Sequence, residues 1–251
     1  MKDNLGWQAN NFASYNSVCR QAAADDSAFD CFRSNQVYTT ILAHDDDIQK
    51  TIYLKWLKDH DYSIFDIDSF GGPYSKPSLC TVRYSSTFHH MNHYELLFDG
   101  MTVCEIGAGY GGQALVIGKN HNVKLYVTYD LDGPAALQTR VLKDYGENIE
   151  SFDCRTLLSE ESDPEYDLVI SNYALSELDR EGFDAYFDRV IKKSKSGYFQ
   201  INPQTRNPNC YTKEEIIEKL GSAYDSYTTV EDHFCKPQYQ SYNFILIGKS
   251  S

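Results

Sequence analysis

From residue 101 onward, short apolar runs alternate with segments in which apolar residues recur at a helical spacing. The runs occupy residues 101–106, 124–129, 149–154, 166–171, 198–201, 227–230 and 242–248. Runs of this length are typical of buried strands, and their alternation with helices predicts a parallel sheet covered on both faces. The last two runs have no room for a helix between them, so they must pair antiparallel. The pattern predicts a doubly wound α/β fold with a seven-stranded sheet and an antiparallel C-terminal strand.

The segments between these runs carry helix signals. Helices are predicted over 113–119, 133–145, 179–195 and 212–221. A Thr212–Glu215 capping box begins the last of them. Gly146 is suited to a left-handed helix cap, and Ser196–Gly197 to a turn before the fifth strand.

Residues 1–80 lack this alternation. Helical periodicity over 16–33 and 41–58 is followed by a glycine- and proline-containing breaker at 69–73. The acidic run at 45–47 is interpreted as the start of the second helix, where its charge suits the helix dipole. We interpret 1–80 as a helical cap that covers the ligand crevice of the sheet and makes the contacts of a homo-oligomer. Residues 81–251 form the main domain.

The composition of the chain limits the kinds of binding partner that we expect. The net charge of −13 over 251 residues argues against nucleic acid and against anionic membrane surfaces, which would repel it. The seven cysteines are scattered and never in C-x-x-C spacing, which predicts free thiols rather than disulfides or a zinc site. A polar N-terminus and the absence of any apolar run of membrane-spanning length predict a cytoplasmic protein.

The first predicted strand is followed by a glycine-rich turn. Its four glycines are Gly107, Gly109, Gly111 and Gly112. A strand, a glycine turn and a helix start together present backbone N–H groups to a nucleotide-like ligand. The glycine spacing fits dinucleotide folds, but Glu105 stands two residues before the first glycine. A carboxylate there suits a ligand with an ammonium group and repels a pyrophosphate. We therefore predict S-adenosylmethionine rather than a nicotinamide or flavin cofactor.

Further residues are placed to complete such a site. Asp130 ends the second strand, where a carboxylate accepts hydrogen bonds from both ribose hydroxyls. The alternative role for Asp130 is a helix or turn cap. Asp153 or Cys154, at the end of the third strand, is predicted to border the adenine. The predicted cofactor-binding residues are Glu105, Gly107, Ala108, Gly109, Gly111, Asp130, Leu131, Asp153 and Asn172.

The fourth strand neighbours the first in a doubly wound sheet, so its end faces the reactive part of the cofactor. The residues where an acceptor must enter are Ser171, Asn172, Tyr173, Ser176 and Glu177, at and just after the end of that strand. The simpler interpretation makes Asn172 and Ser176 helix caps.

Three histidines, His89, His90 and His93, precede the first strand. Three interpretations stay open: incidental histidines on a helix, a catalytic base or substrate contact, and a metal site. The spacing identifies no carboxylate partner for a metal, and we predict none.

Four segments together resemble a known family: EIGAGYGGQA, YDL at the second strand, DLVISNYALSEL at the fourth and VIKKSKSGYFQIN at the fifth. They resemble the bacterial and viral sugar O-methyltransferases, which are class I S-adenosylmethionine-dependent methyltransferases with a Rossmann-like fold. The resemblance covers residues 84–248. It implies S-adenosylmethionine as donor and, as acceptor, a hydroxyl of a nucleotide-linked or surface-glycan sugar in polysaccharide biosynthesis.

A sugar hydroxyl is a weak nucleophile, so a base should assist its attack. The predicted catalytic residues are Glu177, His90, His93 and Tyr173. Glu177 or a histidine takes the proton, while Asn172 and Tyr173 position the acceptor. Three rival functions stay open: methylation of another small acceptor such as an amine or phosphate ester, NAD-dependent oxidation of a sugar, and a non-enzymatic scaffold.

Overall fold

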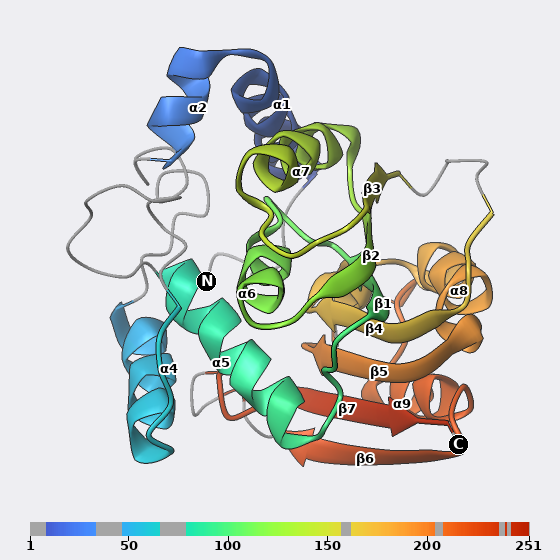
Figure 1. The fold of residues 1–251 in the computed structure, drawn as a ribbon. Helices are drawn as coiled ribbons and strands as arrows, with labels where there is room; N and C mark the ends of the chain where they lie inside the picture. The colour runs from blue at the N-terminus through green and yellow to red at the C-terminus, as the bar shows by residue number, and fades with distance from the viewer. Residues whose placement is uncertain are drawn as a thin grey trace.

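A seven-stranded sheet with strand order β3-β2-β1-β4-β5-β7-β6 forms the centre of the protein (Figure 1). The computed structural model describes residues 9–33, 47–65, 79–156, 162–203, 208–235, 239 and 242–250. The strands are β1 (Met101–Ile106), β2 (Val123–Tyr129), β3 (Phe152–Arg155), β4 (Tyr166–Asn172), β5 (Ser194–Ile201), β6 (Ser226–Glu231) and β7 (Phe244–Lys249). β7 runs antiparallel to both β5 and β6, and β1 pairs in parallel with β2 and β4. The predicted doubly wound sheet, with its antiparallel C-terminal strand, is confirmed.

Helices cover both faces of this sheet (Figure 1). On one side are α5 (Leu79–His93), α6 (Gly112–Asn120) and α7 (Asp132–Tyr145), and on the other α8 (Arg180–Arg189), η2 (Ile191–Lys193) and α9 (Lys213–Gly221). Successive strand residues point to opposite faces, so the core has two halves. Val103, Ile170 and Tyr198 pack in the α5–α7 half, whereas their neighbours Cys104 and Val169 pack in the α8–α9 half.

The N-terminal helices are α1 (Ala9–Ala24), α2 (Asp26–Arg33) and α4 (Asp47–Asp59). α1 lies against α7 and α4 against α5 (Figure 1). At the first contact, Arg20 pairs with Asp132, and the Gly133 N–H donates to Asn16 Oδ1 at 2.6 Å. A Cβ at Gly133 would lie 2.0 Å from the Asn16 carbonyl oxygen, so this close approach requires glycine.

The predicted N-terminal helices are therefore present, while the domain boundary near residue 80 stays a prediction. The breaker at 69–73 and two of the acids at 45–47 lie outside the described residues.

Three local predictions need correction. Gly146 does not adopt the left-handed cap: its φ is −72°, and glycine is needed because a Cβ would meet the Leu142 carbonyl oxygen at 2.4 Å. Ser196 and Gly197 lie inside β5 rather than in a turn. Gly197 has no side chain to displace the Phe199 and Tyr224 rings, which a Cβ would meet at 2.3 Å. The helix predicted to reach residue 195 ends earlier, as α8 followed by the single turn η2.

A buried carboxylate, Asp163, ties the chain before β4 to the α8 face. It accepts hydrogen bonds from the hydroxyls of Tyr129 and Tyr166 at 2.7 and 2.6 Å and from Arg189 Nε at 2.6 Å, and it pairs with Arg155 at 3.2 Å. Burial opposes its ionisation, but these hydrogen bonds outweigh burial and lower the pKa of Asp163. The charge is thus held in place by four donors.

We expect Asp163→Asn to lower the free energy of unfolding by about 2 kcal/mol at pH 7, because Arg189 loses its anionic partner and Arg155 keeps only Asp153. Arg189 still reaches solvent, which keeps the loss below that of a fully enclosed pair. The matched control is Asp188→Asn in the exposed pair with Lys192, expected to cost under about 0.5 kcal/mol. Urea unfolding measures both, and equal costs for the two variants would contradict the network's role.

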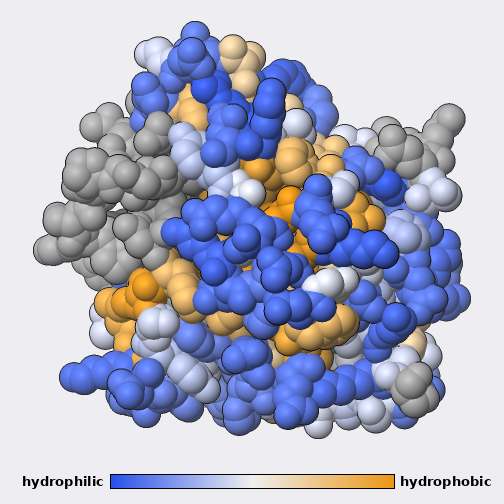
Figure 2. Space-filling view, in the orientation of Figure 1, coloured by the Kyte–Doolittle hydropathy of each residue, from blue (hydrophilic) through white to orange (hydrophobic). Residues whose placement is uncertain are grey.

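The helix faces turned to solvent are mainly hydrophilic in the view of Figure 2. This agrees with a chain in which 24% of residues are charged. Among the described residues, no helix is both long and apolar enough to span a membrane.

Candidate functional site

The glycine turn after β1 closes at the carboxyl edge of the sheet, the edge where the parallel strands end. Gly107, Gly109 and Gly111 have φ values of 76°, 62° and 91°, a region that side-chain-bearing residues rarely adopt. The Gly107 N–H donates to the Tyr129 carbonyl at 2.8 Å, and the Gly111 N–H to the Ala108 carbonyl at 2.9 Å. The turn therefore folds tightly over the ends of β1 and β2 before α6 begins.

Glu105 is a buried acid beneath this turn. Its side chain is 1% exposed, and Glu105 Oε2 accepts a hydrogen bond from the Tyr126 hydroxyl at 2.8 Å. Burial raises the pKa of Glu105 to about 7, against the smaller lowering effects of Tyr126 and Arg83. A buried carboxylate is costly unless a cation binds it. This position therefore favours a ligand that brings a positive charge.

Asp130, at the end of β2, braces the glycine turn. Its carboxylate accepts from the Gly109 and Leu131 N–H groups, each at 2.8 Å, and from Gln138 Nε2 at 3.2 Å. Burial raises the pKa of Asp130 to about 6. A carboxylate has about four acceptor sites, so this capping role leaves room for a ligand hydroxyl. Beside it the Leu131 side chain is 41% exposed, an apolar surface at the same edge.

Aromatic side chains cover the turn. A Cβ at Gly109 would lie 3.5 Å from the Tyr15 hydroxyl and 3.7 Å from the Tyr84 hydroxyl, so α1 and α5 both reach this glycine. Tyr84 also packs edge-on against Tyr110, with ring centroids 5.9 Å apart. Helices α1 and α5 thus contribute directly to the surroundings of the turn.

The end of β4 supplies a second turn that touches the first. A Cβ at Gly107 would meet the Ala174 Cβ at 2.1 Å, so glycine is required here by contact as well as by φ. Tyr173 has a positive φ of 71°, and its hydroxyl donates to Asp232 Oδ2 at 2.6 Å. Strained residues of this kind gather at functional sites. The turn continues into η1 (Ala174–Glu177), which packs against β4 and β5 and ends at Glu177.

Glu177 is half-buried and lies within electrostatic reach of Asp130 and Arg83. Burial raises the pKa of Glu177 to about 7, the Asp130 charge raises it further, and the Arg83 charge lowers it. Glu105, Asp130 and Glu177, which we call the acidic group, are therefore three carboxylates with raised pKa values at one edge of the sheet. Such clusters of perturbed acids are typical of functional sites.

Arg83 and Tyr84 were not among the residues predicted for this site. The Arg83 guanidinium donates to the Tyr84 hydroxyl at 3.3 Å and lies over its ring, 5.0 Å from the centroid. Its charge lowers the pKa of both Glu105 and Glu177. The signal was available, since a helix of about four turns before β1 must return from one edge of the sheet to the other. Gln138, which also donates to the Gly109 carbonyl at 2.7 Å, was missed as well.

The structure does not bring the histidines to the acidic group. Within α5, Tyr84 lies beside the glycine turn. Four residues later, the ring of Phe88 lies 5.9 Å from that of His121, at the opposite edge of the sheet. His93 is exposed at the end of α5, and His89 Nε2 donates to the Ser63 carbonyl at 2.9 Å. Residues just before a strand lie at its amino end, away from the carboxyl edge where the acidic group lies.

His90 is buried deeper in the same half of the core. Its Nδ1 is hydrogen-bonded to the Tyr198 hydroxyl at 2.9 Å, and its ring packs edge-on against Phe234. Burial lowers the pKa of His90 to about 4, so the ring is neutral at pH 7. This setting is that of a structural histidine.

Asp153 lies apart as well. It is the register partner of Val127, which faces α8, and its carboxylate pairs with Arg155 at 2.6 Å.

The structure therefore brings together Glu105, the glycine turn, Asp130, Leu131, Asn172, Tyr173 and Glu177, and it leaves Asp153, His90 and His93 outside. In the described ranges, no three histidine, cysteine, aspartate or glutamate side chains are grouped to hold a metal ion.

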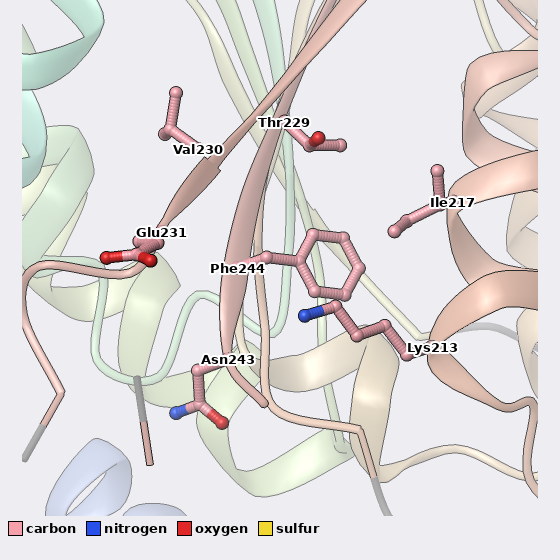
Figure 3. A pocket seen from close by; sticks show the side chains of 7 residues that line it. All are labelled: Lys213, Ile217, Thr229, Val230, Glu231, Asn243 and Phe244. Carbon is pink, nitrogen blue, oxygen red and sulfur yellow. The ribbon is translucent and has the colours of Figure 1, made fainter. Parts of the chain in front are cut away.

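A separate cavity of about 200 Å³ lies between α9 and the β6–β7 edge (Figure 3). Lys213 and Phe244 point toward one another across it, with the Lys213 Nζ 5.4 Å from the ring centroid. It is three to four strand spacings from β1, about 14–19 Å, and smaller than the roughly 300 Å³ of typical ligand sites. We assign no ligand to it.

No protein-family model matches the sequence, and no curated protein is similar to it in sequence. Solved structures are similar in fold. A magnesium protoporphyrin IX methyltransferase from Synechocystis, with bound S-adenosylmethionine, is 16% identical over 81% of this chain and 97% of its own, with a TM-score of 0.52. A geranyl diphosphate C-methyltransferase from Streptomyces coelicolor, with S-adenosyl-L-homocysteine, is 14% identical over 81% and 97%, with a TM-score of 0.52.

A third similar structure is an S-adenosylmethionine-dependent methyltransferase from Clostridium acetobutylicum, 12% identical over 66% of this chain and 89% of its own, with a TM-score of 0.50. These similarities, with the strand order and the antiparallel β7, establish the fold. It is the Rossmann-like fold of class I S-adenosylmethionine-dependent methyltransferases.

Proposed function

We propose that this protein is an S-adenosylmethionine-dependent O-methyltransferase that acts on a sugar hydroxyl. The observation that carries the proposal is Glu105, a buried carboxylate directly beneath a glycine turn of the methyltransferase fold. A cationic amino group satisfies this carboxylate, whereas the pyrophosphate of a nicotinamide cofactor would be repelled by it. The rival NAD-dependent function is disfavoured for this reason, and because dinucleotide-binding sheets usually stay parallel.

The residues at the edge fit the parts of S-adenosylmethionine in order. Glu105 would hold the ammonium, and the turn of Gly107, Ala108, Gly109 and Gly111 would wrap the amino-acid end. Asp130 would accept from one ribose hydroxyl with its remaining acceptor site, and the exposed face of Leu131 would lie against the adenine. Asp153, paired with Arg155, has no part in this arrangement.

When bound, S-adenosylmethionine supplies an electrophilic methyl group on a positively charged sulfur. The protein's first task is alignment, which contributes much of the acceleration in such a displacement. Glu177 would accept the proton of the sugar hydroxyl as the oxygen bonds to the methyl carbon and the carbon–sulfur bond breaks toward sulfur. With a pKa of about 7, Glu177 is both substantially ionised and basic enough at neutral pH. Tyr173, held by Asp232, fixes the turn that carries it.

Thermal-shift measurements with S-adenosylhomocysteine, NAD and NADP test the cofactor, and turnover on nucleoside-diphosphate sugars tests the acceptor. The similar solved structures are named for a porphyrin and for geranyl diphosphate, so the sugar is supported by the sequence resemblance and by the polar edge of β4 and β5. Stabilisation by NAD and not by S-adenosylhomocysteine would contradict the proposal. Homo-oligomer contacts through residues 1–80 stay a prediction, as does the cytoplasmic location.

We expect Asp130→Asn to weaken S-adenosylhomocysteine binding by about 5- to 100-fold, the loss of one hydrogen bond to a charged acceptor. Asp132→Asn is the matched control, because Asp132 carries the same charge two residues further along but is exposed and pairs with Arg20. Its affinity should stay within twofold of wild type. Calorimetric titration measures both, and equal affinities for the two variants would remove Asp130 from the ribose site.

A further inference from the structure

The side-chain amides of Asn172 and Gln200 lie next to each other at the carboxyl edge. The two residues are register partners in the parallel strands β4 and β5, so their side chains share one face of the sheet. Gln200 is fully buried, and the amide atoms of Asn172 are screened from solvent. None of the four amide nitrogens and oxygens has a hydrogen-bond partner among the residues that the structure describes.

Folding does not need this pair. Buried polar groups are normally satisfied, and each one that is not costs stability. The preceding residues on the same face, Ile170 and Tyr198, pack in the core, and Ile245, opposite Gln200 on β7, is fully buried. Apolar side chains would therefore suit these two positions better. A buried polar group that has no hydrogen-bond partner, at a position where an apolar side chain would serve the fold better, is expected at a ligand-binding site.

The pair lies beside the acidic group. Glu105 is the register partner of Ile170, and Ile170 stands two residues before Asn172 on the same strand. The side chains of Glu105, Ile170 and Asn172 therefore all face α5. The strand spacings place the Cα of Asn172 about 8 Å from that of Glu105, toward β5 and the end of the strand. An acceptor at the amides would thus lie next to a donor held by Glu105, on the same edge as Glu177.

We propose that the Asn172–Gln200 amide pair recognises the acceptor by binding two neighbouring hydroxyl groups of a sugar ring. An amide donates through nitrogen and accepts through oxygen, and a hydroxyl does both, so two amides and a diol satisfy one another. A phosphate ester would use the N–H groups alone, an ammonium the carbonyl oxygens alone, and an aromatic ring neither. The inference rests on the proposed function and adds to it the element that reads the acceptor.

Gln200→Met tests the inference, because methionine keeps the length of the side chain and removes the amide. The melting temperature of the free protein should rise by about 2–4 °C, the shift that about one relieved polar group gives in a chain of this size. The kcat/KM for UDP-glucose or GDP-mannose, whichever the wild type methylates, should fall at least tenfold. The Kd of S-adenosylhomocysteine should stay within twofold.

Tyr198→Phe is the matched control, two residues earlier on the same face. Its hydroxyl is hydrogen-bonded to His90 at 2.9 Å, so this variant should melt lower than wild type. A lower melting temperature for Gln200→Met, an unchanged kcat/KM, or a parallel loss of S-adenosylhomocysteine affinity would each overturn the inference alone. Wild-type protein that binds S-adenosylhomocysteine but neither binds nor methylates these sugars would overturn the proposed acceptor together with the inference.

Discussion

Glu105→Gln is expected to stabilise the free protein at pH 8 while weakening S-adenosylhomocysteine binding by about 100-fold. The two effects have one cause. The carboxylate is enclosed beneath the glycine turn, where its charge is costly until an ammonium group binds. Glutamine can still accept the hydrogen bond from Tyr126, so the fold keeps that contact and loses the charge.

The pH dependence separates this explanation from a general packing effect. Burial raises the pKa of Glu105 from its ordinary value of 4.5 to about 7 in the folded protein. Between these values the folded state holds a proton that the unfolded state releases, so the stability contribution falls as pH rises toward 7. At pH 8 the wild type bears nearly the full cost of the buried charge, on the order of 3 kcal/mol. At pH 4 both states are protonated, and the variant and wild type should melt alike.

Urea unfolding of both proteins at pH 4, 6 and 8, with and without S-adenosylhomocysteine, measures the effect. Saturating ligand should reverse the order of stability at pH 8, since wild type alone gains the ammonium contact. Glu165→Gln is the control, an exposed acid near the amino end of β4. A pH-independent difference, or undiminished ligand binding, would show that Glu105 does not meet the ammonium.

The strands and the ligand edge followed from sequence pattern because they depend on local signals. The run at 101–106 is β1 with the same bounds, and the two late runs pair antiparallel as the short connection requires. The Thr212–Glu215 capping box also forms as expected. The parallel order of β1 beside β4 then places Glu105 and Asn172 at one edge. Register and chain direction were enough to assemble this much of the site.

What could not be predicted depends on contacts between segments distant in sequence. Tyr15 and Tyr84 reach Gly109 from helices whose direction and docking no local pattern fixes. Gly146 carries the residue type of a left-handed cap, yet its glycine is required by the approach of the Leu142 carbonyl. The place of the histidines could not be predicted, because spacing alone does not say at which end of a helix a side chain meets the sheet. Gln200 gave no signal, since a single glutamine inside an apolar run is unremarkable until its neighbours are known.

Glu177→Gln is expected to slow methyl transfer by about 10²- to 10⁴-fold, the contribution of a general base. Single-turnover rates at saturating S-adenosylmethionine isolate this step from the titration of Glu105, which affects binding. In the wild type the rate should rise with pH and level off above about 7, because Glu177 must be ionised to accept a proton and its pKa is raised to about 7 by burial. The rate of the Glu177→Gln variant should not show this rise with pH.

Glu181→Gln provides the control, because Glu181 lies four residues further along, exposed in the first turn of α8. Its rate and pH profile should match those of wild type. The affinity of Glu177→Gln for S-adenosylhomocysteine should also be retained, since the proposed mechanism has Glu177 contact the acceptor and not the donor. A loss below about tenfold, or a variant that keeps the wild-type pH profile, would mean that the proton leaves by another route. Arg83 gives a second check: its charge lowers the pKa of Glu177, so Arg83→Met should move the ascending limb to higher pH.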